Sequence, residues 1–195
     1  MGRKNLSEER TTMILDAFER CIVTHGLDGT SLEKVAAEVG FRRGLVRHYL
    51  GNREEMIHML ARRAVTRYAQ QVDELFSWLP ASDPETALLD MFFPETAQTE
   101  TADLLVMEQL IAAAGRYPQI KEWISTWLEG FVVKLGALLG QAYPNADAKR
   151  CWAVAYGIIS IYFNQESMGP LDLADTYREA ARANSARLLD SLSAT

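Results

Sequence analysis

Residues 30–52 read T-S-L-E-K-V-A-A-E-V-G-F-R-R-G-L-V-R-H-Y-L-G-N, and the rest of the chain is interpreted outward from this stretch. Thr30, followed three residues later by Glu33, forms a capping-box pattern that predicts a helix beginning near Ser31. Apolar residues then recur at helical spacing, at Leu32, Val35, Ala36 and Val39. Gly40 comes next, and glycine commonly ends a helix. The stretch therefore opens with one short amphipathic helix.

A second short helix is predicted after Gly40, with one apolar side and one basic side. The apolar side carries Phe41, Leu45, Val46, Tyr49 and Leu50, and the basic side carries Arg42, Arg43, Arg47 and His48. Two helices joined by about 3 to 4 residues that include glycine, the second helix basic, are typical of the helix-turn-helix that reads the DNA major groove. Such pairs also occur in ordinary all-α proteins with a merely solvated basic face, so these residues alone leave both interpretations open.

Residues 10–60 resemble the N-terminal domain of the tetracycline-repressor (TetR) family of bacterial transcription regulators. The resemblance rests on Gly26, Thr30, Val35, Ala36, Gly40, Gly44, the pair His48 and Tyr49, and the N-R-E-E-M sequence of residues 52–56. It implies a homodimeric DNA-binding regulator, most often a repressor, that leaves a palindromic operator when a small molecule binds. We accordingly expect a helix-turn-helix domain over residues 1–51 and an effector-binding and dimerisation domain over residues 52–195.

The expected DNA contacts combine residue chemistry with positions carried over from the resemblance. Arg42, Arg43 and Arg47 are predicted to contact phosphates or guanines, with Gly44 allowing close approach of the backbone. The resemblance adds positioning contacts to phosphates by Thr30, Ser31, His48, Tyr49 and Arg53. The chain departs from the family where Arg42 replaces a small hydroxyl residue and Arg47 replaces a tyrosine, so we expect an altered sequence preference.

Composition and charge favour a helical protein with one positive end. The chain has 195 residues, of which 48% are hydrophobic, and no segment shows clear period-two alternation bounded by turns. Residues 1–67 contain 12 Lys and Arg against 9 Asp and Glu, whereas residues 68–195 contain 8 against 17. The balances of +3 and −9 place the positive charge beside the helix pair, as attraction to phosphates requires.

Seven further helices are predicted, for about nine in an all-α fold. They cover residues 7–26, 52–79, 84–93, 101–115, 118–141, 147–167 and 171–192, after a loose arm at residues 1–6. Asn52 and Glu55 repeat the capping pattern at the start of the helix from residue 52, which at about 40 Å is long enough to connect the N-terminal domain to the rest of the chain. The two cysteines, Cys21 and Cys151, lie inside apolar helical patterns and are predicted to be buried free thiols.

The C-terminal helices suggest a ligand pocket and a dimer interface. Aromatic and apolar residues around one carboxylate form the candidate pocket for a hydrophobic or cationic effector: Met91, Phe92, Phe93, Met107, Glu108, Trp123 and Trp127. Aromatic residues at helical spacing are, however, more often core than ligand-binding. The segment of residues 151–163 is apolar on all sides and needs a partner, which predicts a two-fold four-helix bundle through Trp152, Tyr156, Ile159, Phe163, Tyr177, Ala181 and Leu188.

The sequence contains no recognisable catalytic, metal or cofactor motif. His25, His48 and His58 lack metal-ligand spacing, and there is no glycine-rich phosphate loop or nucleophile elbow. No segment has the length of a membrane span, and we expect a cytoplasmic protein that is not an enzyme. Two alternatives stay open: a DNA-binding protein without an effector, and a helical enzyme or binding module in which the helix pair is incidental.

Overall fold

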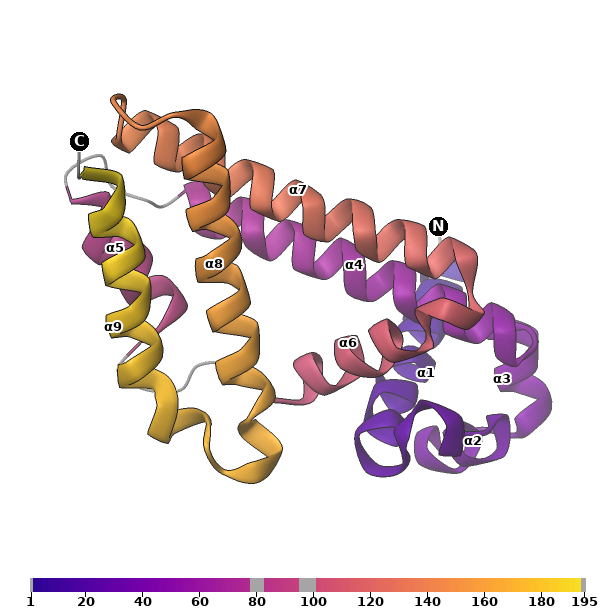
Figure 1. The fold of residues 1–195 in the computed structure, drawn as a ribbon. Helices are drawn as coiled ribbons and strands as arrows, with labels where there is room; N and C mark the ends of the chain where they lie inside the picture. Colours follow the sequence, from indigo (N-terminus) through magenta and orange to yellow (C-terminus); the bar gives the residue numbers. More distant parts are fainter. Residues whose placement is uncertain (1, 78–82, 95–100, 194–195) are drawn as a thin grey trace. The chain divides into compact units, whose positions relative to one another are not determined.

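The computed structural model describes residues 2–77, 83–94 and 101–193, and every regular element within them is a helix (Figure 1). The described α-helices are α1 (Gly2–Gly29), α2 (Leu32–Val39), α3 (Arg43–Leu50), α4 (Arg53–Ser77), α5 (Pro84–Phe92), α6 (Thr101–Ala113), α7 (Pro118–Ala142), α8 (Ala148–Ser167) and α9 (Ala174–Ser193). Short 3₁₀ turns, η1 (Ala114–Arg116) and η2 (Gly169–Leu171), precede α7 and α9. The prediction of an all-α fold with about nine helices is confirmed.

The chain divides into two compact units, each assembled from segments that are distant in sequence. The N-terminal unit contains Met1–Arg67 and Ala102–Ile124, and the C-terminal unit contains Tyr68–Thr101 and Ser125–Thr195. α6 and η1 therefore belong with α1, α2 and α3, although they follow them by more than fifty residues. The functional boundary expected at residue 51 remains a prediction.

α1 differs from the predicted first helix at its beginning. It starts at Gly2, so the loose arm expected at residues 1–6 is wrong for the described residues 2–6. Neither proline nor an interior glycine interrupts residues 3–25, so the helix extends toward the N-terminus. Its backbone becomes non-helical at Gly26 (φ 69°, ψ 166°), the residue at which the helix was predicted to end.

The N-terminal unit is held by apolar side chains from four helices. Ile14, Phe18 and Ile22 recur at helical spacing on α1 and are fully buried. The other members of this core are Val35 and Ala36 of α2, Val46 and Leu50 of α3, and Met56, Ile57 and Leu60 of α4. Because α3 contributes only two buried residues, one turn apart, most of its surface is left for other contacts.

The start of α4 is capped as the sequence predicts. The backbone N–H of Asn52 donates to Glu55 Oε2 at 2.7 Å, and the N–H of Glu55 donates to Asn52 Oδ1 at 3.0 Å, which is a reciprocal capping box. Gly51, just before it, has φ 73°, and a β-carbon there would lie 2.1 Å from Glu55 Oε2. Only glycine fits this position, so the entry into α4 fixes where α3 ends. The predicted end of α4 near residue 79 lies outside the described residues.

Candidate nucleic-acid interface

The turn between α2 and α3 is shaped by one cap at each helix end. Ser31, in extended conformation, accepts the N–H of Lys34 at 3.3 Å and is the N-cap of α2. Gly40 adopts the left-handed conformation (φ 72°, ψ 24°), and its N–H donates to the carbonyls of the last turn of α2. Arg42 then returns to extended backbone as the N-cap of α3. The two helices are therefore joined by three residues, as a helix-turn-helix requires.

Thr30 does not have the predicted capping role, because Ser31 occupies the N-cap position. Thr30 is 1% exposed, and its hydroxyl donates to the carbonyl of Gly26 at 2.8 Å. Its side chain therefore ties the end of α1 to the start of α2. We leave Thr30 out of the proposed DNA contacts, whereas the half-buried Ser31 is retained.

α3 presents an exposed strip formed by Arg43, Gly44, Arg47 and His48. Val46 and Leu50 on the opposite side are buried, so the helix is anchored by one face while the other faces solvent. Arg42, at the N-cap, is also exposed, and its side chain makes no capping hydrogen bond. The sequence prediction of a basic exposed face on this helix is confirmed, whereas its contact with DNA remains a prediction.

Arg43 and Arg47 differ in their partners. Arg43 Nε lies 2.7 Å from Glu33 Oε1 of α2, and both side chains are well exposed. The pKa of Glu33 is lowered mainly by its own backbone N–H, then by the Ser31 hydroxyl and by Arg43. Water screens an exposed ion pair of this kind and leaves it with little effect on stability, so a phosphate can replace Glu33 at little cost. Arg47 and Arg42 form no ion pair with any described carboxylate.

Arg53 is already engaged inside the N-terminal unit. Its guanidinium donates to the carbonyls of Thr30 at 2.5 Å and Leu27 at 2.8 Å, and it lies 3.5 Å from Asp28 Oδ1. Arg53 thus braces the loop between α1 and α2 against the start of α4. The phosphate contact expected of Arg53 from the family resemblance would have to compete with these three partners, so we do not include it in the proposed interface.

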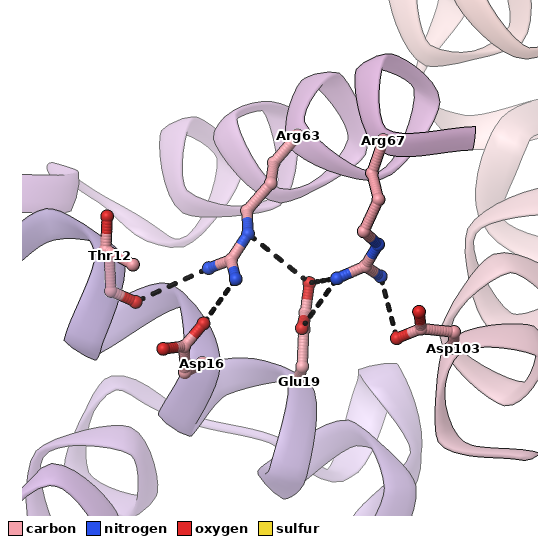
Figure 2. A network of polar contacts seen from close by, with 6 residues as sticks. All are labelled: Thr12, Asp16, Glu19, Arg63, Arg67 and Asp103. Atoms are coloured by element: carbon pink, nitrogen blue, oxygen red, sulfur yellow. Dashed lines mark hydrogen bonds and ion pairs between the residues drawn. The ribbon is translucent and has the colours of Figure 1, made fainter. Parts of the chain in front are cut away.

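Two further arginines of α4 are also occupied by internal carboxylates, as Figure 2 shows. Arg63 pairs with Asp16 and lies 3.8 Å from Glu19, while Arg67 lies 3.3 Å from Glu19 and 2.8 Å from Asp103 of α6. These side chains are only partly exposed, and they join α1, α4 and α6. The charges of Arg63 and Arg67 therefore serve the interior of the unit, whereas Arg42 and Arg47 beside the turn remain free of carboxylate partners among the described residues.

His48 and Tyr49 lie together at one edge of α3. Their rings meet edge to face with centroids 5.2 Å apart, His48 exposed and Tyr49 half-buried. The Tyr49 hydroxyl accepts a hydrogen bond from Nη1 of Arg10, on α1, at 3.1 Å. Sequence reasoning missed Arg10, because nothing in the sequence indicates that residues 39 positions apart meet.

The residues predicted to bind a ligand fall in two different units. Met107, Glu108 and Trp123 belong to the N-terminal unit, whereas Met91, Phe92, Phe93 and Trp127 belong to the C-terminal unit. We therefore do not propose the seven residues as one site. Within the C-terminal unit, ring contacts join eight side chains, here called the aromatic cluster: Tyr68, Phe76, Phe92, Phe93, Trp127, Phe131, Tyr162 and Phe163.

Trp127 has an unusual environment within the aromatic cluster. The residue is 8% exposed, and its ring centroid lies 5.4 Å from Tyr68, 6.2 Å from Phe131 and 6.1 Å from Phe163. Its indole Nε1 is buried, and within the described part of the chain no acceptor receives its hydrogen. A buried N–H without an acceptor costs roughly 1 to 3 kcal/mol, so a molecule that supplies an acceptor would bind favourably there.

The residues predicted at a dimer interface separate into exposed and buried groups. Trp152 and Tyr156 of α8 are 48% and 56% exposed, their rings stack at 5.8 Å, and Tyr177 of α9 is also exposed. Ile159 and Ala181 are buried within their own chain, Phe163 contacts Trp127, and Leu188 packs beside Gly157. The side of α8 that lies within its own chain is apolar and buried, while its other side exposes Trp152 and Tyr156.

The described residues contain neither a metal-ligand cluster nor a helix that could span a membrane. Among them, no three His, Cys, Asp or Glu side chains are grouped as metal ligands would be. None of the described helices has the length and hydropathy needed to cross a membrane. Cys21 and Cys151 are both free and buried, which confirms their predicted state.

Comparisons with known proteins connect this geometry to one family. Residues 14–60 match the family model of bacterial regulatory proteins of the tetR family. The HTH-type transcriptional repressors AcnR of Corynebacterium efficiens and Corynebacterium glutamicum are each 33% identical over 61 residues, which cover 31% of this chain and 32% of the repressor. The match thus spans about a third of these curated relatives, and the matched family segment contains α2 and α3.

Solved structures share the fold over almost the whole chain. A TetR transcription regulator from Haloarcula marismortui has a TM-score of 0.74 at 18% identity, covering 94% of this chain and 98% of that chain. A transcriptional regulator from Rhodococcus sp. Rha1 has a TM-score of 0.73 at 20% identity, covering 92% and 95%. At such low identity the likeness shows the helical fold alone.

Proposed function

We propose that this chain, which belongs to the tetR family of bacterial regulatory proteins, is a homodimeric transcriptional repressor released from its operator by a small apolar molecule. The observation that carries the DNA-binding part is the exposed strip of α3. It holds Arg47, which pairs with none of the described carboxylates, next to Arg42 at the N-cap, on a helix anchored by its opposite face. Guanidinium groups presented this way suit bidentate contacts with guanine and phosphate in the major groove.

The exposed aromatic residues of α8 and α9 support the homodimer. Trp152, Tyr156 and Tyr177 leave large apolar surfaces in water, and the small residues Ala153, Ala180 and Ala183 beside them are also exposed. A two-fold four-helix bundle of α8 and α9 with the same helices of a second copy would cover these side chains. A two-fold dimer carries two α3 helices, which suit the two half-sites of a palindromic operator in successive major grooves roughly 34 to 36 Å apart.

The DNA-binding function is tested by selection from a pool of random duplexes with the purified full-length protein. We expect enrichment of a two-fold symmetric site whose half-sites are centred about 10 base pairs, or one helical turn, apart. The binding constant should fall steeply as salt rises, because phosphate contacts release counterions. The proposal would be contradicted if no site were enriched over several rounds while circular dichroism showed that the protein was folded.

The aromatic cluster supports the effector part, and Trp127 indicates its chemistry. The rings in contact with Trp127 are those of Tyr68, Phe131 and Phe163, and a flat apolar molecule can stack on them. The unpaired Nε1 hydrogen favours a molecule that also carries an acceptor. Glu108, on which a cationic effector would depend, belongs to the other unit. Such a ligand would release DNA only if it bound more tightly to a form of the dimer that cannot bind DNA than to the form that can.

Trp127→Phe should distinguish compounds with and without an acceptor. Quinoline and naphthalene have the same shape, but only quinoline carries a ring nitrogen that accepts a hydrogen bond. We expect quinoline to bind the natural chain about fivefold more tightly, and Trp127→Phe to remove this difference, since one net hydrogen bond stabilises by about 1 kcal/mol. Thermal shift and tryptophan fluorescence measure both affinities.

The control for this experiment is Trp123→Phe, which changes a half-buried tryptophan of the N-terminal unit and should leave the preference for quinoline intact. If neither compound binds the natural chain, or if both bind it equally, the acceptor site at Trp127 is wrong, while DNA binding through α3 is unaffected.

A further inference from the structure

Arg10 lies on α1, and its side chain reaches Tyr49 of α3. Its Nη1 donates to the hydroxyl oxygen of Tyr49 at 3.1 Å in a partly buried contact. Arg10 is half-buried, and so is Tyr49, whose ring also contacts His48. The guanidinium is therefore held at one edge of the exposed strip of α3.

The charge of Arg10 is not balanced inside the N-terminal unit. Six other arginines of this unit each pair with a carboxylate: Arg20 with Glu38, Arg43 with Glu33, Arg53 with Asp28, Arg63 with Asp16, Arg67 with Asp103 and Arg116 with Asp28. Among the described side chains, none forms an ion pair with Arg10. Among the described residues, its side-chain hydrogen-bond partner is the Tyr49 hydroxyl, which carries no carboxylate charge. A guanidinium that is partly withdrawn from water and lacks an anion favours binding one.

Arg10 and Tyr49 both have hydrogen-bond donors that remain available to an acceptor. A guanidinium has five N–H groups, and the contact with Tyr49 uses one of them. Because the Tyr49 oxygen accepts from Arg10, its own O–H remains available as a second type of donor. Two donor groups and one positive charge suit an oxyanion, and phosphate oxygens accept from guanidinium and hydroxyl groups alike.

The position of Tyr49 on α3 places this pair on one flank of the recognition helix. At about 100° per residue, Arg47 and Tyr49 lie on opposite sides of the strip centred on Gly44 and His48. A helix in the major groove lies between two sugar-phosphate backbones, so each flank faces a different strand. Arg47 borders one flank, and the Arg10 and Tyr49 pair borders the other.

We propose that Arg10 and Tyr49 together bind a phosphate of the DNA backbone on the flank of α3 opposite Arg47. Arg10 contacts the phosphate directly and also orients the Tyr49 hydroxyl toward the same group. This inference rests on the proposed DNA-binding function and adds to it a contact from α1. The ligand is the backbone of double-stranded DNA, independent of base sequence.

The test measures the binding of a fluorescein-labelled mixed-sequence 30-base-pair duplex, with the ionic strength set by potassium chloride and no inorganic phosphate present. Arg10→Ala should weaken binding about tenfold and reduce the slope of log affinity against log salt by about one, because one phosphate contact is lost. Arg10→Lys should keep the slope, since it keeps the charge. Tyr49→Phe should weaken binding a few-fold without changing the slope. The double variant should bind no more weakly than Arg10→Ala, because the two groups hold one phosphate.

The matched control is Lys149→Ala, which removes one exposed positive charge from α8 of the other unit and should leave affinity and slope unchanged. Circular dichroism establishes that each variant is folded. If Arg10→Ala loses affinity at an unchanged slope, Arg10 only positions Tyr49, and the phosphate contact is wrong. If Arg10→Ala behaves like Lys149→Ala, the inference fails while the proposed function stands. If the natural chain binds no duplex, both fail.

Discussion

Tyr156→Glu is expected to convert the protein into a monomer that binds a two-half-site operator about 100-fold or more weakly. Tyr156 is 56% exposed and stacks on Trp152, so a carboxylate at this position should not disturb the fold of its own chain. In the proposed dimer the same carboxylate would be buried against apolar side chains of the second copy, at a cost of several kcal/mol. Losing the second recognition helix removes the gain of roughly 10²- to 10⁴-fold that linked binding provides.

Sedimentation or light scattering measures the oligomeric state of the Tyr156→Glu protein. Fluorescence anisotropy measures its affinity for the selected operator and for a single half-site. Half-site affinity should stay within about twofold of the natural chain, because α3 is untouched. Val133→Glu on α7 is the matched control, since Val133 is 57% exposed in the same unit but lies outside α8 and α9. A Tyr156→Glu protein that remains dimeric would show that α8 is not the interface.

Local signals in the sequence predicted the helix ends most reliably. Gly40 and the Asn52 and Glu55 capping box act over three or four residues, and the structure contains both as expected. The cap of α2 was misplaced by one residue because Thr30 and Ser31 are both good caps, and the sequence does not show which hydroxyl is buried. Thr30 is drawn inward to the carbonyl of Gly26, which leaves the N-cap to Ser31.

The side chains of the candidate site could be predicted only in part. The exposed arginines of α3 follow from helical periodicity, because that pattern separates Val46 and Leu50 from Arg43 and Arg47. The contacts of Arg53 and Arg10 involve residues 23 to 39 positions away in the sequence, which helical periodicity does not reveal. Family resemblance assigned Arg53 to DNA, while the fold uses it to hold the loop after α1.

The sequence did not indicate which segments make up the N-terminal unit. Residues of α6 and η1 join it through side chains: Asp103 pairs with Arg67, Gln109 accepts the N–H of Leu27 at 3.1 Å, and Arg116 lies 3.0 Å from Asp28. The contacts of Gln109 and Arg116 reach the end of α1, which Arg53 also holds. The unit that carries α3 is therefore larger than residues 1–51.

Arg47→Ala is expected to weaken operator binding by roughly 1 to 3 kcal/mol, or about 5- to 150-fold, without lowering stability. Arg47 is exposed and forms no ion pair with a described carboxylate, so alanine, a good helix former, removes only what Arg47 offers to a partner. If Arg47 holds a guanine, selection with Arg47→Ala should lose its preference at one base per half-site. If it holds a phosphate, the site should be unchanged and the salt slope should fall by about one per subunit.

Arg47→Lys separates these two roles further, because lysine keeps the charge but cannot form the planar bidentate contact with guanine. If Arg47 contacts a guanine, Arg47→Lys should lose nearly as much operator affinity as Arg47→Ala. If Arg47 contacts a phosphate, Arg47→Lys should keep most of the operator affinity of the natural chain. Arg62→Ala is the matched control, since Arg62 is also exposed and without an ion pair among the described residues, but lies on α4. Equal effects of Arg47→Ala and Arg62→Ala would mean that only total charge matters, and α3 would lose its place as the helix that reads DNA.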